Sequence, residues 1–208
     1  GTGPKGQKGA TGPQGSGGSG SSPPGPTGPK GAQGVKGQKG AKGPKGEPGD
    51  DCFEISTPVL MSDDSTKAYG SIQKGDVVKS VTFEELTSTD IPSIFLNESS
   101  TTLTPTLTTS TVTNIRFGTE NQYFNVNNGF LKVTAEHPLL VKRGDTWTWK
   151  RVWGLQTGDK LYKFDNTEVE VTSVTYVTND WIDYAVMNVE NTDSYFVNGI
   201  LAHNFKGP

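Results

Sequence analysis

From residue 52 onward, hydrophobic and polar positions alternate in short runs, a pattern typical of β-strands with one buried face. The runs are rich in β-branched and aromatic residues, and turns containing Gly, Asn or Asp separate them: CFEISTPVLM, VVKSVTF, TVTNIRF, YFNV, FLKVTA, EVEVTSVTYV, AVMNVE and SYFVNGILA. A period of two repeated along this much of the chain predicts an all-β domain.

Other local signals are weaker. Single helical turns are expected at 83–86 and at 150–155. The Ser/Thr-rich segment 87–111 contains Pro92 and Pro105, so we expect a surface excursion that adds little to the core. The tryptophans are expected to cover the core of the sheets: Trp147, Trp149, Trp153 and Trp181.

Two segments resemble each other. SIQKGDVV and GLQTGDKL each place a Gly-Asp pair directly before a predicted strand. This internal similarity indicates two related halves of one pseudo-symmetric sheet system. The Asn198-Gly199 pair is a strong signal for a tight hairpin turn between the two hydrophobic runs beside it.

The first 51 residues follow a period of three. Glycine occupies every third position from 3 to 18 and, in a shifted frame, from 25 to 49. Gly-X-Y repeats with Pro and Lys are typical of the collagen triple helix, because only glycine fits at its crowded axis. We therefore expect residues 1–51 to be a collagen-like segment able to homotrimerise, with a flexible interruption at 19–24. A disordered Gly/Pro linker is the alternative.

Charge and composition divide at the same place. Residues 1–51 carry seven lysines and three acidic residues, a formal charge of +4, whereas the whole chain of 208 residues carries −3. No dense basic and aromatic patch indicates a nucleic-acid partner, and no apolar run reaches the about 18 residues of a membrane helix. The single cysteine excludes an intrachain disulfide, and neither a metal nor a cofactor is expected.

The β-rich part of the chain begins and ends with a residue that can break a peptide bond. Cys52 lies where the period changes, and a cysteine thiolate can attack the preceding carbonyl, turning the Asp51-Cys52 peptide into a thioester. Asn204 ends the segment YFVNGILAHN, and its side-chain amide can attack its own carbonyl, closing a succinimide and breaking the peptide to Phe205. His203 is placed to polarise that carbonyl.

These blocks resemble those of the Hint (hedgehog/intein) family, in its bacterial or phage intein-like form. The first block is CFEISTPVLM, the second is GFLKVTAEHPLLV with Thr134 and His137 as a Thr-x-x-His pair, and the third is MNVENTDSYFVNGILAHN. They follow the family's order over residues 52–204. The resemblance implies a pseudo-two-fold Hint domain at 52–204, followed by a short C-terminal flank at 205–208.

The resemblance also implies catalytic roles for particular residues. Thr134 and His137 would contact the scissile peptide, with His137 donating a proton to the departing amine of Cys52. His203 would assist the cyclisation of Asn204.

One position departs from the family pattern. A few residues before the YFVNG strand, where the family often has a catalytic histidine, this chain has Asp193, or Thr192 if the register shifts. Asp180 and Asp183 are nearby acids that offer alternative assistance. We include Asp193 among the catalytic candidates.

A further departure determines the expected reaction. Splicing needs Cys, Ser or Thr after the terminal asparagine, and this chain has Phe205. We therefore expect single-turnover autocatalytic cleavage at one or both junctions, with release or transfer of the collagen-like segment to water or an amine. The Asp51 carboxylate could also attack the thioester, forming a transient cyclic anhydride. The alternative is an inactive Hint-like cap or display module on a collagen-like fibre, such as a bacteriophage tail fibre, in an extracellular or virion setting.

Overall fold

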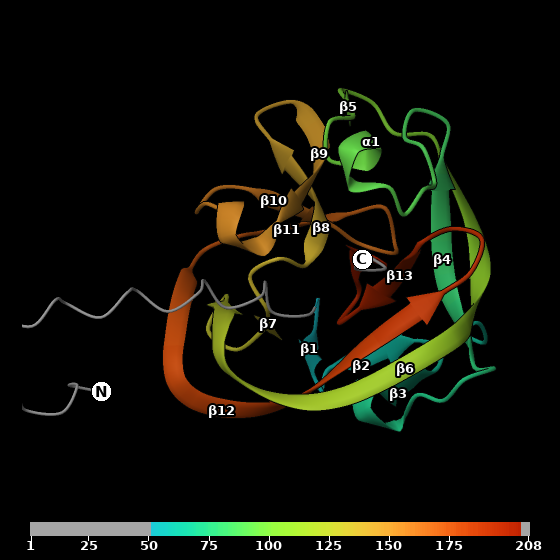
Figure 1. Ribbon diagram of the computed structural model, residues 1–208. Helices are drawn as coiled ribbons and strands as arrows, with labels where there is room; N and C mark the ends of the chain where they lie inside the picture. Colours follow the sequence, from blue (N-terminus) through green and yellow to red (C-terminus); the bar gives the residue numbers. More distant parts are fainter. Residues whose placement is uncertain (1–50, 205–208) are drawn as a thin grey trace, which may run out of the picture. The chain divides into compact units, whose positions relative to one another are not determined.

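The computed structural model describes residues 51–204, which form an all-β domain (Figure 1). The predicted collagen-like segment, apart from its last residue, lies outside the described residues, as do its interruption at 19–24 and the flank 205–208. Within the described part of the chain, no helix has the length and apolar character needed to cross a membrane.

The elements follow one another in short steps. The strands are β1 (Phe53–Glu54), β2 (Pro58–Leu60), β3 (Thr66–Ala68), β4 (Val77–Phe83), β5 (Ser99–Ser100), β6 (Pro105–Val126), β7 (Leu131–Val133), β8 (Pro138–Arg143), β9 (Thr146–Arg151), β10 (Lys160–Tyr162), β11 (Glu168–Glu170), β12 (Val174–Val189), β13 (Ser194–Val197) and β14 (Ile200–His203). The helical turns are η1 (Tyr69–Ser71), α1 (Pro92–Phe95) and η2 (Val152–Gly154).

Two sheets carry the fold. One has the order β12-β1-β7-β6-β4, and β6 also pairs with β12. The other has the order β11-β10-β8-β14-β13-β2-β3, with β9 on β8 and β5 on β9. The strand pairings within residues 51–204 are antiparallel, which suits the short turns that connect them.

A long two-stranded ribbon curves along one side of the domain (Figure 1). It consists of β6, which unites the predicted TVTNIRF and YFNV runs into one strand of 22 residues, and β12, with 16 residues. The register shifts between Thr178 and Ile182, where Asn179 adopts a φ of 61°. Such a bulge increases the local twist and bends the ribbon.

The core has two clusters, and the hairpin β13–β14 lies between them. Tyr195 and Val197 belong to the larger cluster, to which both sheets contribute, whereas Phe196 belongs to the smaller one. In β14, Ala202 belongs to the larger cluster and Leu201 to the smaller one. Every residue of both strands is buried. This explains why YFVNGILA is nearly continuous in its hydrophobicity instead of alternating.

The two Gly-Asp segments form matching turns, as the internal similarity predicts. The N–H of Gln73 donates to Asp76 Oδ2 over 2.7 Å, and the N–H of Gln156 donates to Asp159 Oδ2 over 2.8 Å. The glycine before each aspartate has the same φ of 92°. Each aspartate also binds a basic side chain from an earlier strand, Lys67 or Arg143.

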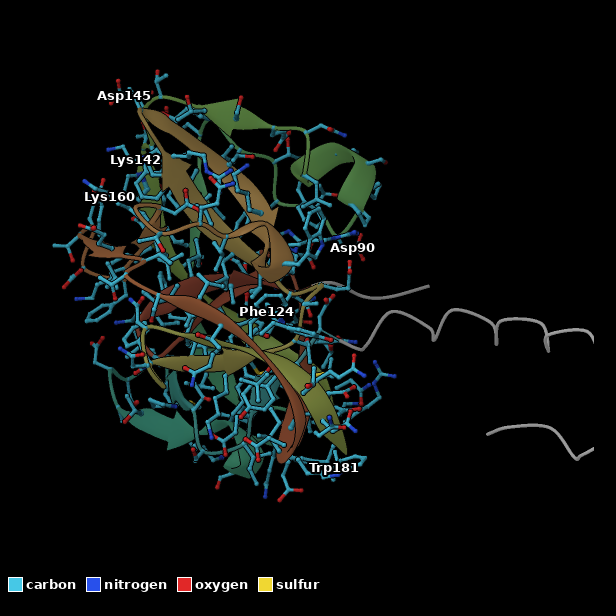
Figure 2. The ribbon with its side chains drawn as sticks, turned by 90° about the vertical axis from the view of Figure 1, so that its left-hand side faces the viewer. Asp90, Phe124, Lys142, Asp145, Lys160 and Trp181 are labelled. Atoms are coloured by element: carbon cyan, nitrogen blue, oxygen red, sulfur yellow. The ribbon has the colours of Figure 1, made fainter. Side chains whose placement is uncertain are left out.

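Some local expectations were wrong. Residues 83–86 form no helical turn, whereas the expected turn at 150–155 contains η2. The segment 87–111 holds α1, β5 and the start of β6, and its Phe95 is fully buried. Trp147 and Trp149 cover the smaller core cluster, but two other tryptophans are exposed by 59% and 67%: Trp153 and Trp181. Figure 2 shows Trp181 at the lower edge of the view, midway along β12.

The two aspartate turns give a stability prediction. Arg143 binds both carboxylate oxygens of Asp159, a side chain only 2% exposed, so Asp159→Ala should cost about 3 kcal/mol of unfolding free energy. Asp76, whose side chain is 23% exposed, binds Lys67 through one oxygen, so Asp76→Ala should cost about 1 kcal/mol. Urea unfolding of both variants at pH 7 measures this difference, and equal costs would contradict it.

The same carboxylate makes the cost depend on pH. Burial raises the pKa of Asp159, but the hydrogen bonds from Arg143 and Gln156 outweigh burial and hold this pKa below its ordinary 3.8. The stabilisation by the ionised carboxylate is therefore complete above pH 3.8 and is lost as the pH falls below that value. The gap in unfolding free energy between the parent and Asp159→Ala should narrow in this acid range.

Candidate functional site

The pairing of β1 with β7 holds Cys52 against Thr134. Phe53 lies opposite Val133, so Cys52, one residue before β1, lies opposite Thr134, one residue after β7. The N–H of Thr134 donates to the Cys52 carbonyl over 3.0 Å. The N–H of Cys52 donates to Thr134 Oγ1 over 2.9 Å. This N–H belongs to the Asp51-Cys52 peptide, so a hydroxyl directly contacts the nitrogen of the predicted cleavage point.

His137 is placed by the turn that joins β7 to β8. Its N–H donates to the Thr134 carbonyl over 3.4 Å, and its own carbonyl accepts the N–H of Val152 over 3.0 Å. The buried imidazole packs against Phe53, with ring centroids 4.2 Å apart, and its edge faces Tyr195 at 6.5 Å. Backbone and ring contacts therefore both fix the side chain.

The surroundings keep His137 neutral. Burial lowers the pKa of its imidazole to about 3, the Asp51 backbone opposes this shift, and nearby His203 adds to it. A backbone group that favours the imidazolium must be an acceptor, which is the carbonyl oxygen. The carbonyl of Asp51 is the one that a Cys52 thiolate would attack.

A pair of tyrosine hydroxyls lies close to the same junction. Tyr69 and Tyr195 are fully buried and share a hydrogen bond of 2.8 Å, and Tyr69 also accepts the N–H of Met187. Burial is the main cause of the raised pKa of both hydroxyls, and Cys52 and Asp51 act in the same direction. Both hydroxyls are therefore neutral, and the sequence alone had not drawn attention to them.

The register of the β13–β14 hairpin holds Asp193 against Asn204. Asn198 and Gly199 form the two-residue turn with φ values of 48° and 75°, which glycine and asparagine adopt most readily. Ser194 lies opposite His203, so the next pair outward is Asp193 and Asn204. The N–H of Asn204 donates to the Asp193 carbonyl over 2.6 Å, continuing the ladder by one step.

The side-chain amide of Asn204 is oriented by two acceptors. Its Nδ2 lies 3.2 Å from the Val189 carbonyl oxygen and 3.3 Å from Asp193 Oδ1. Its Oδ1 is buried and has no hydrogen-bond partner within residues 51–204. The nucleophilic nitrogen of the predicted cyclisation therefore contacts a carboxylate, which is a proton acceptor.

His203 contacts the carbonyl at which Asn204 would react. Its Nδ1 lies 3.1 Å from the Asn204 carbonyl oxygen, and it donates to that oxygen in the Nδ1–H tautomer. Its buried ring stacks on Phe95, with centroids 3.8 Å apart and planes 16° apart. Trp149 meets the imidazole edge-on at 4.9 Å.

The Thr192 side chain makes different contacts from that of Asp193. Its hydroxyl bonds to Ser80 Oγ over 2.7 Å and to Ser110 Oγ, and Ser80 bonds further to Ser194. These buried hydroxyls anchor the loop before β13, whereas Asp193 is the side chain that meets Asn204. Of these two residues, Asp193 is therefore the one whose side chain bonds Asn204.

The two alternative acids lie elsewhere. Asp180 and Asp183 are exposed on β12, and Asp180 accepts the hydroxyl of Tyr123 over 2.5 Å. Neither is among the hydrogen-bond partners of Asn204. Asp193 is the only one of the three acids bonded to Asn204 in the described structure.

The predicted residues lie in two buried groups. One contains Cys52 and Thr134, with His137 packed on the neighbouring Phe53. The other contains Asp193, His203 and Asn204. Sequence reasoning missed Phe95 and the Tyr69–Tyr195 pair. The apolar stretch IPSIFL within the Ser/Thr-rich segment was an available signal for Phe95.

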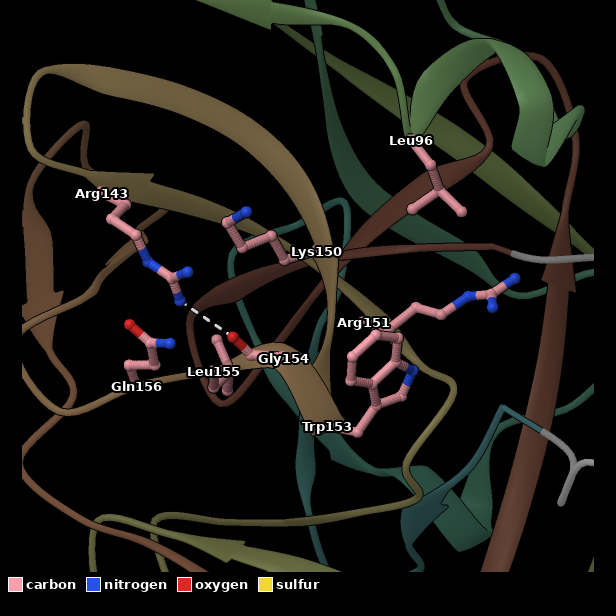
Figure 3. Close-up of a pocket in the computed structure, with 8 residues that line it drawn as sticks. All are labelled: Leu96, Arg143, Lys150, Arg151, Trp153, Gly154, Leu155 and Gln156. Carbon is pink, nitrogen blue, oxygen red and sulfur yellow. Dashed lines mark hydrogen bonds between the residues drawn. The ribbon is translucent and has the colours of Figure 1, made fainter.

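An open pocket of about 510 Å³ lies outside this site (Figure 3). Figure 3 shows the indole of Trp153 beside Arg151, and Arg143 donating to the Gly154 carbonyl over 2.8 Å. None of the six predicted residues lines this pocket: its walls are Leu96, Arg143, Lys150, Arg151, Trp153, Gly154, Leu155 and Gln156. Within residues 51–204, no three His, Cys, Asp or Glu side chains gather as metal ligands would.

Solved structures with this architecture include inteins and an intein-like domain. A variant of the Ssp DnaB mini-intein aligns with a TM-score of 0.54 at 13% identity, covering 76% of this chain and 96% of the mini-intein. The bacterial intein-like domain from Clostridium thermocellum aligns with a TM-score of 0.52 at 19% identity, covering 74% and 98%. A gp41-1 intein variant gives 0.50 at 16% identity, covering 74% and 99%.

The chain has the intein fold. The all-β, pseudo-two-fold Hint architecture predicted from the sequence blocks is thereby confirmed. The chain matches no protein-family model and no curated protein sequence. Identities this low establish the fold of residues 51–204, and the chemistry has to be argued from the side chains themselves.

Within this intein fold, the neutral His137 predicts how stability depends on pH. The folded pKa of about 3 lies below the ordinary 6.5, so the unfolded chain binds more protons between these values. The stability associated with neutral His137 is complete above pH 6.5 and falls by about 1.4 kcal/mol per pH unit below it, until about pH 3.

Urea unfolding at pH 7, 6 and 5 measures this effect in a chain that carries both Cys52→Ala and Asn204→Ala, so that neither predicted cut can occur. His137→Gln in that background should flatten the decline in stability. NMR titration of the imidazole gives the direct reading, and a His137 signal that titrates near pH 6.5 would contradict the burial argument.

Proposed function

We propose that residues 52–204 are an intein-like self-processing domain that cleaves its own chain beside Cys52 and after Asn204. The observation that carries the proposal is the pair of matched junctions. At one, Thr134 bonds the amide nitrogen next to the nucleophile; at the other, Asp193 and His203 bond the nucleophile and its target carbonyl.

In the first step, the Cys52 thiolate attacks the carbonyl carbon of Asp51. A C–S bond forms, the C–N bond breaks, and the amine of Cys52 leaves with a proton. Thr134 Oγ1 is the group bonded to that nitrogen, and His137, neutral near pH 7, is close enough to the Asp51 backbone for that backbone to affect its pKa. A neutral imidazole can donate one proton and accept another, as this exchange requires.

The thioester then needs an acceptor from outside the splicing pathway, because Phe205 carries no nucleophile. Water or an amine would release or transfer residues 1–51. The buried carboxylate of Asp51 offers an internal route: a C–O bond closes a five-membered anhydride, the C–S bond breaks, and Cys52 leaves as a thiolate. Water then opens the anhydride, so hydrolysis is favoured over storage of the thioester.

In the other step, Asn204 Nδ2 attacks the carbonyl carbon of Asn204. The ring C–N bond forms and the peptide bond to Phe205 breaks. The proton on Nδ2 passes towards Asp193 Oδ1, and the Phe205 nitrogen takes up a proton as it leaves. His203 Nδ1–H stabilises the negative charge that develops on the carbonyl oxygen.

The outcome is maturation of a collagen-like protein in a single turnover. Each nucleophile is part of the chain it cuts, which replaces a bimolecular encounter and removes up to about 7–11 kcal/mol from the barrier. The released segment 1–51 retains the Gly-X-Y repeats with which it could homotrimerise.

Two alanine variants separate the steps. Cys52→Ala should abolish cleavage after Asp51 and leave cleavage after Asn204, because the two nucleophiles act on different peptides. Asn204→Ala should do the reverse. Intact mass of the purified full chain, followed with time at neutral pH, assigns each fragment. If neither variant changes the fragments, the cuts come from a contaminating protease; if the parent chain stays whole, the domain is an inert cap.

Asp193 supplies a finer prediction. Asp193→Asn keeps the size of the side chain but removes the proton acceptor, so cleavage after Asn204 should slow by about 100-fold. Asp183→Asn, an identical change at an exposed position of β12, is the matched control and should leave the rate unchanged. A rate for Asp193→Asn equal to that of the control would remove Asp193 from the mechanism.

A further inference from the structure

His203 needs an external constraint to act at the Asn204 carbonyl. The torsion that rotates an imidazole about its Cβ–Cγ bond has a broad preference. A half-turn about that bond would carry Nδ1 away from the carbonyl and present a carbon in its place. His203 is also the last residue of β14, where the ladder gives less support than in the strand interior. The 3.1 Å contact therefore depends on what surrounds the ring.

Two aromatic rings provide that surrounding. Phe95 covers one face of the imidazole, stacked at 3.8 Å with the planes 16° apart. Trp149 meets the imidazole nearly perpendicular, at 84°, and Phe95 at 84° as well. These contacts define the plane of the His203 ring, and the Asn204 carbonyl lies within reach of Nδ1 in that arrangement.

Phe95 is held in place by the strand that carries Trp149. β5 pairs with β9, and the Thr148 hydroxyl donates to the Glu98 carbonyl over 3.0 Å. The carboxylate of Glu98 accepts the N–H of Thr87 over 2.8 Å, which closes the segment into a loop. Phe95 and Trp149, the two rings that contact His203, are therefore held together by the pairing of β5 with β9.

The short helix α1 buries one side chain selectively. Phe95 is fully buried, whereas its neighbours Ile91 and Ile94 are 47% and 40% exposed. A segment that served only to extend the core would bury more of its apolar surface. Figure 1 shows α1 next to β5, apart from the β6–β12 ribbon.

We propose that Phe95 is a positioning residue for cleavage after Asn204: its ring, carried by the 87–104 segment, fixes the His203 imidazole with Nδ1–H on the scissile carbonyl. The inference deepens the proposed function and rests on it for the cleavage reaction. It assigns Phe95 no contact with the reacting atoms. The first junction, where Thr134 contacts the peptide, does not use this ring and should be independent of it.

The kinetic test compares both cuts in the same full-length chain. Phe95→Leu keeps an apolar side chain but removes the stacked ring, so cleavage after Asn204 should slow by about 10- to 100-fold. Thiol-induced cleavage after Asp51 should stay within about twofold, showing that the domain is folded. Phe95→Tyr restores an aromatic face and should return most of the lost rate.

Phe83→Leu is the matched control. Phe83 packs against the same apolar cluster, but its ring meets Tyr162 and it is not one of the rings on His203. The same chemical change there should leave cleavage after Asn204 within about twofold of the parent. Equal slowing in the two leucine variants would reduce Phe95 to ordinary packing and overturn the inference.

A spectroscopic reading needs no cleavage. In an Asn204→Ala chain, which keeps the backbone carbonyl, ¹⁵N NMR of the imidazole should show the Nδ1–H tautomer of His203. Adding Phe95→Leu should give a mixture of tautomers, and an unchanged tautomer would overturn the inference. The two proposals can therefore fail separately. If the tautomer changes but the parent chain never cleaves after Asn204, Phe95 does position His203, and the proposed cleavage at that junction is wrong.

Discussion

Two antiparallel registers place five of the six candidate residues; His137, in the turn between β7 and β8, is the sixth. The pairing of Phe53 with Val133 carries Cys52 onto Thr134, and the pairing of Ser194 with His203 carries Asp193 onto Asn204. In both cases the reacting residue lies one step beyond the paired strand, where its peptide is still bonded but no longer constrained by a complete ladder. If the register of either strand pair shifted by one residue, these side chains would point to the opposite face of the sheet and the site would not form.

Burial gives these contacts their strength. The six candidate residues are almost completely inaccessible to solvent, and the hairpin between them is buried on both faces. In such surroundings the imidazole of His137 is neutral, and a hydrogen bond to a carbonyl is stronger than it would be in water. Because water is excluded, hydrolysis of the proposed thioester depends on whether water or an amine can enter the site, or on attack by the carboxylate of Asp51 itself. In the proposed mechanism, the buried junctions and the absence of a nucleophile at Phe205 favour cleavage over splicing.

The sequence predicted much of this arrangement because its signals are local. Period-two runs predicted the strands, and the Asn198-Gly199 turn alone determines the register that pairs Asp193 with Asn204. The contact of Phe95 with His203 could not be recognised, because the two residues are more than 100 positions apart; the apolar stretch IPSIFL could have indicated only that Phe95 is buried. The four tryptophans differ in burial because of where they lie in the fold. Trp147 and Trp149 share the buried face of β9, whereas Trp153 lies in a helical turn and Trp181 beside a bulge.

The central claim is that the Asp51-Cys52 peptide converts into a thioester inside this fold. The most direct measurement is the intact mass of the full chain incubated at neutral pH with a small thiol, with circular dichroism recorded in parallel to show that the β-structure persists. The account predicts two species that grow together: residues 1–51 carrying the thiol at their C-terminus, and a fragment that begins at Cys52. A chain that keeps its mass for days while folded would contradict it and leave an inert domain with the intein fold.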